Sequence, residues 1–262
     1  MTARTGVDLV LREGTRLMRI LLIRHGDPDY ENDSLTEKGR REAHMLASRL
    51  INERIDYIYT STMGRAMETA KPTLEAKGMK AEPLDWLREF SARRIRRPDY
   101  NGELAPVCWD WLPEDWTVRP VLYDKDNWFK DDIMAEPDMG SYEKMVHEGL
   151  DTLLAGHGYE REGMYYRTNK ANDDTIALFC HFGLGCVILS HLLGIAPLPL
   201  MQGFAAAPTS VTTIYTEERR EGIASFRVAC YGDTTHLYVN NETPSFSARF
   251  CEMYSNKEER HD

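Results

Sequence analysis

Five side chains in this sequence could together transfer a phosphoryl group: Arg24, His25, Arg65, Glu89 and His181. A neutral imidazole such as that of His25 is a nucleophile and can carry a phosphoryl group covalently. Guanidinium groups match the geometry of phosphate oxygens and stay charged at any working pH, so Arg24 and Arg65 could hold the anion. His181 could donate a hydrogen bond to a phosphate oxygen. Glu89 could protonate the leaving oxygen if burial or neighbouring charge raises its pKa.

The predicted elements would bring these side chains to one place. Strands and helices alternate along the chain, which is typical of an α/β fold with a parallel sheet, and such sheets bind ligands beyond the carboxyl ends of their strands. His25, Arg65, Glu89 and His181 each follow a different predicted strand. The expected strands are 19–23, 55–59, an extended segment ending near 86–89, 175–180, and an antiparallel pair at 211–215 and 225–231. The expected helices open at Ser34 or Thr36, near Arg65, at 141–154 and at 183–193.

We therefore expect a three-layer α/β sandwich with a largely parallel central sheet, helices on both faces and an inserted, mainly helical cap. Residues 1–17 carry charges throughout and precede the first strand, so we interpret them as an N-terminal extension to a single domain of residues 18–262. The character of the chain changes between about 93 and 172, where four of the five tryptophans lie, and we interpret this segment as the cap. Its helix at 141–154 would pack through Tyr142, Met145, Val146 and Leu153.

The composition argues against several classes of partner. The net charge is −10 and the pI is about 5.4, and an acidic protein repels both nucleic acid and anionic lipid. Five scattered cysteines without C-x-x-C spacing argue against a disulfide framework or a zinc knuckle and suit a reducing cytoplasm. Neither a secretory signal nor a membrane span is predicted. We expect a cytoplasmic protein that acts on a small-molecule phosphate ester, and the sequence does not indicate its oligomeric state.

Four segments, in this order along the chain, resemble the histidine phosphatase (phosphoglycerate mutase-like) superfamily. They are Arg24-His25-Gly26, Ser61-x-x-x-Arg65-Ala66-x-x-Thr69-Ala70, Leu87-Arg88-Glu89 and Cys180-His181-Phe182-Gly183. The resemblance covers approximately residues 18–92 and 173–232 and leaves the insertion unmatched. It implies that His25 is the phosphorylated nucleophile, that Arg24, Arg65 and His181 form the phosphate pocket, and that Glu89 is the proton donor. It implies neither a metal ion nor a cofactor.

Two departures from the family pattern affect the expected reaction. Mutases of the family usually follow Arg-His-Gly with Glu-Ser and a longer loop that contains Asn and Trp, whereas here the loop runs from Asp27 to Asn32. We therefore expect hydrolysis of a phosphate monoester through phospho-His25. After the second histidine many members carry Gly-Gly, but here Phe182 places a bulky side chain over one pocket amide. We expect Asn32 and Phe182 to contact the substrate.

Several alternatives stay open. A phosphomutase would use the same intermediate, a phosphate-ester binding protein would keep the pocket without turnover, and a metal-dependent hydrolase is disfavoured by sparse, unclustered His and Asp residues.

The run Arg93–Arg97 is either a solvated surface or a site that steers an anion or holds a second phosphate or carboxylate. The tryptophans either form the core of the cap or stack on the leaving group. Glu89 has nearby competitors in Glu82, Asp85 and Glu103, and we expect no catalytic role for His44, His147, His157, His191, His236 and His261.

Overall fold

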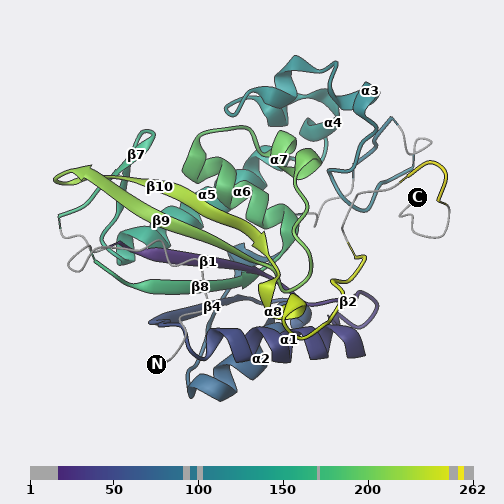
Figure 1. Cartoon of the computed structure of the whole chain (residues 1–262). Helices are drawn as coiled ribbons and strands as arrows, with labels where there is room; N and C mark the ends of the chain where they lie inside the picture. The colour runs from purple at the N-terminus through teal and green to yellow at the C-terminus, as the bar shows by residue number, and fades with distance from the viewer. Residues whose placement is uncertain (1–16, 91–94, 99–102, 170–171, 248–252, 257–262) are drawn as a thin grey trace.

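The centre of the molecule is an eight-stranded mixed sheet in the order β5-β4-β8-β1-β9-β10-β7-β6 (Figure 1). The structure, a computed structural model, describes residues 17–90, 95–98, 103–169, 172–247 and 253–256. Strands β5, β4, β8 and β1 pair in parallel, and the strands beyond β1 pair antiparallel. The strands are β1 (Arg19–Arg24), β4 (Tyr57–Ser61), β5 (Glu82–Leu84), β6 (Glu160–Glu162), β7 (Tyr165–Arg167), β8 (Thr175–Cys180), β9 (Val211–Arg220) and β10 (Ile223–Asp233), with a separate two-stranded ribbon of β2 (Pro28–Asp29) and β3 (Ser34–Leu35).

Helices cover both faces of the sheet (Figure 1). Helices α1 and α2 lie against one face, and α5, α6 and α7 lie on the other, so the predicted α/β fold with helices on both faces is confirmed. The helices are α1 (Glu37–Leu50), α2 (Gly64–Lys77), α3 (Pro113–Trp116), α4 (Asp132–Ala135), α5 (Met139–Gly156), α6 (Phe182–Leu193), α7 (Pro197–Gly203) and α8 (Thr235–Tyr238), with 3-10 turns η1 (Asp85–Leu87), η3 (Pro120–Tyr123) and η4 (Trp128–Lys130).

Alternation along β1 divides the core in two. Leu21 and Ile23 belong to the cluster under α1 and α2, whereas Ile20 and Leu22 belong to the larger cluster under α6. A strand that is buried on both faces has no polar positions in its interior, which explains the continuous apolar run at 20–23. The first polar side chains after this run are therefore those at the carboxyl edge of the sheet.

Of the two predicted starts of the first helix, the structure has Thr36, whose Oγ1 accepts the Gly39 amide at 3.0 Å, while Ser34 lies in β3. The predicted buried face of α5 was wrong in part, because Met145 is exposed and Glu143 is buried. The indole nitrogen of Trp128 donates to Glu143 at 2.8 Å, and this partner lets a carboxylate occupy a core position.

The segment predicted to form the cap has two structural parts. Its helices end at Gly156, and β6 and β7 then join the edge of the main sheet through pairing of β7 with β10. Trp109, Trp111 and Trp128 are buried in the same cluster as the side chains of α6, so the expectation that they form a small core of their own is wrong. Residues 1–16, within the predicted extension, lie outside the described part of the chain.

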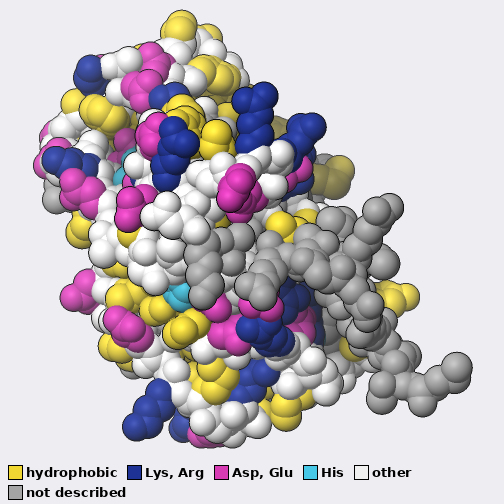
Figure 2. Space-filling view, turned by 90° about the vertical axis from the view of Figure 1, so that its left-hand side faces the viewer, with side chains coloured by type: hydrophobic (Ala, Val, Ile, Leu, Met, Phe, Trp, Pro, Cys, Tyr) yellow, Lys and Arg dark blue, Asp and Glu magenta, His cyan; other side chains and the backbone are white. Residues whose placement is uncertain are grey.

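Charges of both signs are interspersed on the face that carries the β9–β10 turn. Figure 2 shows this face, on which Lys and Arg side chains lie among Asp and Glu side chains. In the described part of the chain, no helix is both long enough and apolar enough to cross a bilayer.

Candidate active site

The two histidines meet because their strands are neighbours in register. Arg24 at the end of β1 pairs with Cys180 at the end of β8, so His25 and His181 are the next residues on two adjacent parallel strands. Their rings lie 5.1 Å apart between centroids, and each residue is 1% exposed. The structure thus brings together the two histidines that the sequence places at separate strand ends.

A single hydrogen bond determines the tautomer of His25. Its Nδ1 lies 2.7 Å from the carbonyl oxygen of Gly26, and because a carbonyl can only accept, Nδ1 carries the proton. Burial lowers the pKa of His25 well below its ordinary value, and the charges of Arg24 and Arg65 lower it further. The ring is therefore neutral, with an unprotonated Nε2.

Helix α2 holds the backbone that follows His25. The Gly26 amide donates to Thr69 Oγ1 at 2.9 Å, and the Thr69 hydroxyl donates to the Arg65 carbonyl oxygen at 2.7 Å. A Cβ atom on Gly26 would lie 2.8 Å from the carbonyl oxygen of Gly39, so this close approach requires glycine. These contacts fix the position of His25 relative to Arg65.

His181 is oriented by Ser61 at the end of β4. Its Nε2 lies 2.8 Å from Ser61 Oγ, which also accepts the Met63 amide at 3.2 Å. In the tautomer in which the Ser61 hydroxyl donates to Nε2, Nδ1 of the neutral His181 ring carries the proton and can donate to a ligand. Burial lowers the pKa of His181 well below its ordinary value, with further lowering by the His25 ring and nearby arginines.

Both predicted arginines are buried beside the histidines, at 5% and 6% exposure for Arg24 and Arg65. Arg24 Nη1 donates to the carbonyl oxygens of Ala206 at 2.6 Å and Ser247 at 3.2 Å. Arg65 Nη1 pairs with the Asp33 carboxylate at 2.6 Å. Arg65 Nη2 also donates to Met63 Sδ at 3.5 Å. The Nε atoms of both guanidinium groups are left available to an anion.

Three buried nitrogens of these side chains lack hydrogen-bond partners among the described residues: Arg24 Nε, Arg65 Nε and His181 Nδ1. A buried donor without a partner costs about 1–3 kcal/mol, so native proteins rarely leave one unsatisfied. Three such donors on neighbouring side chains make a site suited to an anion that carries several acceptor oxygens.

Glu89 lies near Arg24 and Arg65 and is held from two sides. Its Oε1 accepts the amides of Phe90 at 2.9 Å and Leu184 at 3.0 Å, and Leu184 belongs to the first turn of α6. Burial raises the pKa of Glu89, although Arg65, these amides and Arg24 oppose the shift. The competitors Glu82, Asp85 and Glu103 are all exposed.

The two predicted substrate contacts differ in their placement. Phe182 is buried beside Arg24, with the guanidinium carbon 6.0 Å from the ring centroid. Asn32 is exposed, and its amide donates to Asp29 Oδ2 at 2.8 Å within its own loop, so the structure does not bring it to the pocket. Tyr30 of the same loop instead lies near Arg65, 5.5 Å from guanidinium carbon to ring centroid.

Three residues near the site were not assigned to it from the sequence. Asp33 anchors Arg65, Trp109 packs edge-on against Phe182 at 5.7 Å between centroids, and the Tyr142 hydroxyl donates to the Glu89 carbonyl oxygen at 3.0 Å. Trp109 is one of the tryptophans for which stacking on a leaving group was an alternative to a place in the cap core, whereas no sequence pattern pointed to Tyr142. The turn chemistry of an Asn-Asp pair is the only available signal for Asp33, which has a positive φ of 45°.

Several of the other residues considered in the sequence have structural partners instead of a place in the site. Arg97 is buried and donates to the carbonyl oxygens of Trp109 and Asp110, so for this residue the interpretation as solvated surface is wrong, whereas Arg96 is exposed. Arg93 and Arg94 lie outside the described residues. His191 contacts Asp151 at 2.9 Å, and His157 contacts Asp174 at 3.0 Å. Within the described ranges, no group of three or more His, Cys, Asp or Glu side chains could hold a metal ion.

Comparison with known proteins places this site in a family. The profile of the histidine phosphatase superfamily (branch 1) matches residues 20–121. A probable phosphoglycerate mutase GpmB of Yersinia pestis is 34% identical over 231 residues, which cover 84% of this chain and 95% of the relative. Phosphoserine phosphatase 1 of Hydrogenobacter thermophilus is 22% identical over 82% of this chain and 94% of its own.

Solved structures share the fold. A mycobacterial glucosyl-3-phosphoglycerate phosphatase superposes with a TM-score of 0.55 at 19% identity, covering 83% of this chain and 99% of its own. A phosphoserine phosphatase from Entamoeba histolytica in complex with phosphoserine gives a TM-score of 0.52 at 19% identity, covering 84% and 99%. With a relative 34% identical across most of its length, the chain belongs to the histidine phosphatase superfamily.

Proposed function

We propose that this chain hydrolyses a small phosphate monoester in two steps through a phosphohistidine at His25. The observation that carries the proposal is the tautomer of His25, whose Nδ1 donates to Gly26 and whose Nε2 keeps its lone pair. Around this nitrogen lie two buried arginines and a neutral histidine with nitrogens that lack partners in the described part of the chain. This combination of a nucleophilic nitrogen and anion-binding side chains suits an in-line attack on a bound phosphoryl group.

In the first step, His25 Nε2 would attack phosphorus while the bond from phosphorus to the leaving oxygen breaks. Arg24, Arg65 and His181 Nδ1 would stabilise the charge on the equatorial oxygens, so no metal ion is needed for that role. Glu89, protonated because burial raises its pKa, would give its proton to the departing oxygen. In the second step the Glu89 carboxylate would take a proton from water as the water oxygen attacks the phosphohistidine, which releases phosphate and restores both residues.

The segment at about 93–172 is proposed to act as the cap that selects the substrate. Its Trp109 packs on Phe182 beside Arg24, and its Tyr142 binds the backbone of Glu89. Side chains of this segment therefore lie next to both the phosphate pocket and the proton donor. Relatives named for phosphoserine and glucosyl-3-phosphoglycerate support a small phosphorylated metabolite as the substrate class.

Phosphomutase activity is a second candidate, favoured by the 34% identity to a probable phosphoglycerate mutase. Both reactions would use the same phosphohistidine and differ in the acceptor, which is water in one and a second hydroxyl of the substrate in the other. A mutase primed with a bisphosphate would yield isomerised monophosphate and little free phosphate.

The test is release of phosphate from p-nitrophenyl phosphate between about pH 4 and 8 in excess EDTA. We expect the wild type to turn over and His25→Ala to be inactive, while His44→Ala, an exposed histidine on α1, serves as the matched control and keeps full activity. Equal activity of His25→Ala and the wild type would refute the nucleophile. Activity that disappears in EDTA would refute metal independence.

A further inference from the structure

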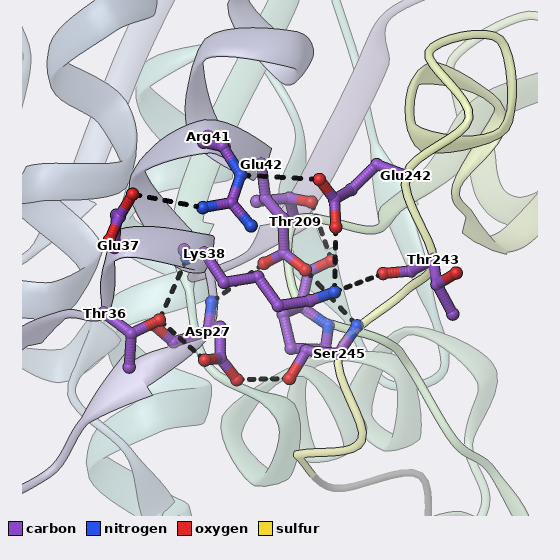
Figure 3. Close-up of polar contacts among 12 residues, drawn as sticks. Asp27, Thr36, Glu37, Lys38, Arg41, Glu42, Thr209, Glu242, Thr243 and Ser245 are labelled. Atoms are coloured by element: carbon purple, nitrogen blue, oxygen red, sulfur yellow. Dashed lines mark hydrogen bonds and ion pairs between the residues drawn. The ribbon is translucent and has the colours of Figure 1, made fainter.

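Glu42 on α1 is buried, at 0% exposure, yet takes no part in the proposed reaction. One carboxylate oxygen accepts the Asp27 amide at 3.0 Å and the other accepts the Ser245 amide at 3.3 Å. Asp27 lies two residues after His25, whereas Ser245 lies near the end of the described chain. Figure 3 shows Glu42 between these two segments. One side chain thus binds the backbone that follows the nucleophile to a segment distant in sequence.

Further contacts join the same segments. We call residues 242–247 the carboxyl-terminal strap. The Asp27 carboxylate accepts the hydroxyl of Ser245 with one oxygen and that of Thr36 with the other, the latter at 2.7 Å. Lys38 Nζ binds the strap from α1, through Glu242 Oε1 at 2.9 Å and the Thr243 carbonyl oxygen at 2.5 Å (Figure 3). The strap is therefore fastened both to α1 and to the loop after β1.

The strap in turn contacts the phosphate pocket. The Ser247 carbonyl oxygen accepts Arg24 Nη1 at 3.2 Å, and the Ser247 amide donates to Ser245 Oγ at 3.2 Å. Ser245 therefore links Glu42 to one of the two carbonyl groups that orient the Arg24 guanidinium. A displacement of the strap would move this hydrogen-bond acceptor and change the direction of the Arg24 donors.

We propose that Glu42 is a positioning residue for the phosphate pocket: its carboxylate holds the loop after His25 and the strap together, and thereby sets the orientation of Arg24. The inference rests on the proposed function of the same site. A carboxylate suits this place because both of its oxygens accept, whereas the glutamine side chain has one acceptor oxygen and would direct an amide N–H at a backbone N–H.

Positioning by Glu42 should depend on pH, because both of its carboxyl oxygens accept hydrogen bonds only when the group is ionised. Burial raises the pKa of Glu42 to about 7; the charge of Asp27 adds to the rise, and the hydrogen bond from the Asp27 amide and the charge of Lys38 oppose it. Below about pH 7 Glu42 takes up a proton, and one of its oxygens becomes a donor. Other charged or titratable groups on the elements around it include Arg41 on α1, Glu242 on the strap and His236 on α8, whose ring is hydrogen-bonded to Thr209. Helix α1 also carries Glu37, Arg40, His44 and Arg49.

The experiment compares Glu42→Gln with Glu37→Gln, the same substitution at an exposed position on the same helix. kcat/KM for p-nitrophenyl phosphate is measured from about pH 5.5 to 8.5, and orthovanadate affinity is measured by calorimetry in parallel. At pH 8 we expect Glu42→Gln to lose about tenfold or more in kcat/KM and to bind vanadate more weakly, because small displacements of catalytic groups are costly. Glu37→Gln should match the wild type in both.

The ratio of wild-type to Glu42→Gln kcat/KM is the decisive quantity, because titration of the substrate and of shared catalytic groups cancels in it. We expect this ratio to be largest above pH 7 and to fall as the pH decreases, since the wild-type Glu42 then becomes protonated. A loss that is constant with pH would mean that the substitution only damages the fold, and it would overturn the proposal. Equality of Glu42→Gln with Glu37→Gln would overturn it as well.

Two further arms separate the possible failures. Ser245→Ala removes the hydroxyl that Asp27 accepts, so it should weaken activity in the same direction and covers the case in which Glu42→Gln does not fold. The double variant should lose less than the product of the two single losses, because both act through the strap. His25→Ala measured in the same series reports on the proposed function alone: retained activity there refutes the nucleophile, while vanadate affinity still tests Glu42.

Discussion

His25 and His181 are both buried and neutral, and their different hydrogen-bond partners give them different roles. The carbonyl oxygen of Gly26 accepts a hydrogen bond from Nδ1–H of His25, so Nε2 is unprotonated and can act as a base. The hydroxyl of Ser61 lies 2.8 Å from Nε2 of His181, and Nδ1 of His181 has no hydrogen-bond partner among the described residues. In the proposed mechanism these neighbouring residues on adjacent strands would supply one nucleophile and one hydrogen-bond donor.

Residue types and strand ends were enough to predict most of this arrangement. The structure brings together the predicted residues Arg24, His25, Arg65, Glu89 and His181. The strands before Arg24, Arg65 and His181 are largely buried and apolar, whereas β5, which precedes Glu89, is short and largely exposed. The placement of the Asn32 side chain could not be predicted in this way. Its amide donates to Asp29 within the same polar loop, and the conformation of that loop decides where the side chain lies. No pattern in the residues ranks that contact above a contact with the substrate.

Glu89→Gln should separate proton donation from phosphate binding. We expect kcat for an alkyl phosphate such as phosphoserine to fall by about 10²–10⁴-fold, because its leaving oxygen needs a proton. p-Nitrophenyl phosphate, with a leaving group that departs without one, should lose much less in the phosphorylation step.

The pH dependence of kcat tests the same role of Glu89. The pKa of Glu89 is raised, so its acid form persists to higher pH and wild-type kcat for the alkyl ester should fall as pH rises through that pKa. Glu89→Gln should lack this descending limb, and Glu82→Gln, exposed on β5, should keep it. Equal losses for both esters would contradict the assignment of Glu89 as the acid.

At the scale of elements, the cap segment and α6 meet at Gly183. A Cβ atom there would overlap the Trp109 ring and lie 3.0 Å from Glu89 Oε1. Gly183→Ala should therefore cost about 1–3 kcal/mol in the free energy of unfolding, as overpacking does, and should reduce activity by displacing Glu89. Gly156→Ala, at the end of α5 with nothing within 4 Å of the added carbon, is the control for urea denaturation. Similar unfolding free energies for the two variants would show that the Trp109 ring can move to accommodate the added carbon, and would contradict the expected overpacking.

Elements with a strong apolar period were predicted well, and those without one were not. β8 runs from Thr175 to Cys180 as expected, because six consecutive buried residues leave little choice. β6 and β7 were missed, since each has three residues and alternation cannot be recognised over so few. The face of α5 was misplaced because Glu143 was taken for a solvated residue, whereas Trp128 provides it with a buried partner.

At the scale of the whole molecule, a chain with a net charge of −10 gathers Arg24 and Arg65 in one buried pocket. The surrounding negative charge would discourage anions elsewhere, so recognition of a phosphate ester depends on these few cations. The burial that neutralises His25 and His181 also raises the pKa of buried carboxyl groups, and the stability of the molecule therefore depends on pH.

Glu143 provides a test of that dependence. Burial raises its pKa to about 7 in the folded state, above its ordinary value of 4.5, so its contribution to stability is present at low pH and is lost as pH rises through 7. The shift corresponds to about 3 kcal/mol at most. Glu143→Gln keeps an acceptor for Trp128 and does not ionise, so its melting temperature relative to the wild type should rise between pH 5 and pH 8. A difference that is the same at both pH values would contradict a raised pKa.

The proposed mechanism requires a covalent phosphoryl group on His25, and this intermediate can be trapped. The chain is mixed with a radiolabelled phosphate monoester in excess EDTA, quenched in alkali within the first turnover, and digested for mass spectrometry. We expect an acid-labile, alkali-stable phosphoryl group on His25 that forms at least as fast as turnover and is absent from His25→Ala. Phosphate found on another residue, or turnover by His25→Ala at the wild-type rate, would contradict the proposed mechanism.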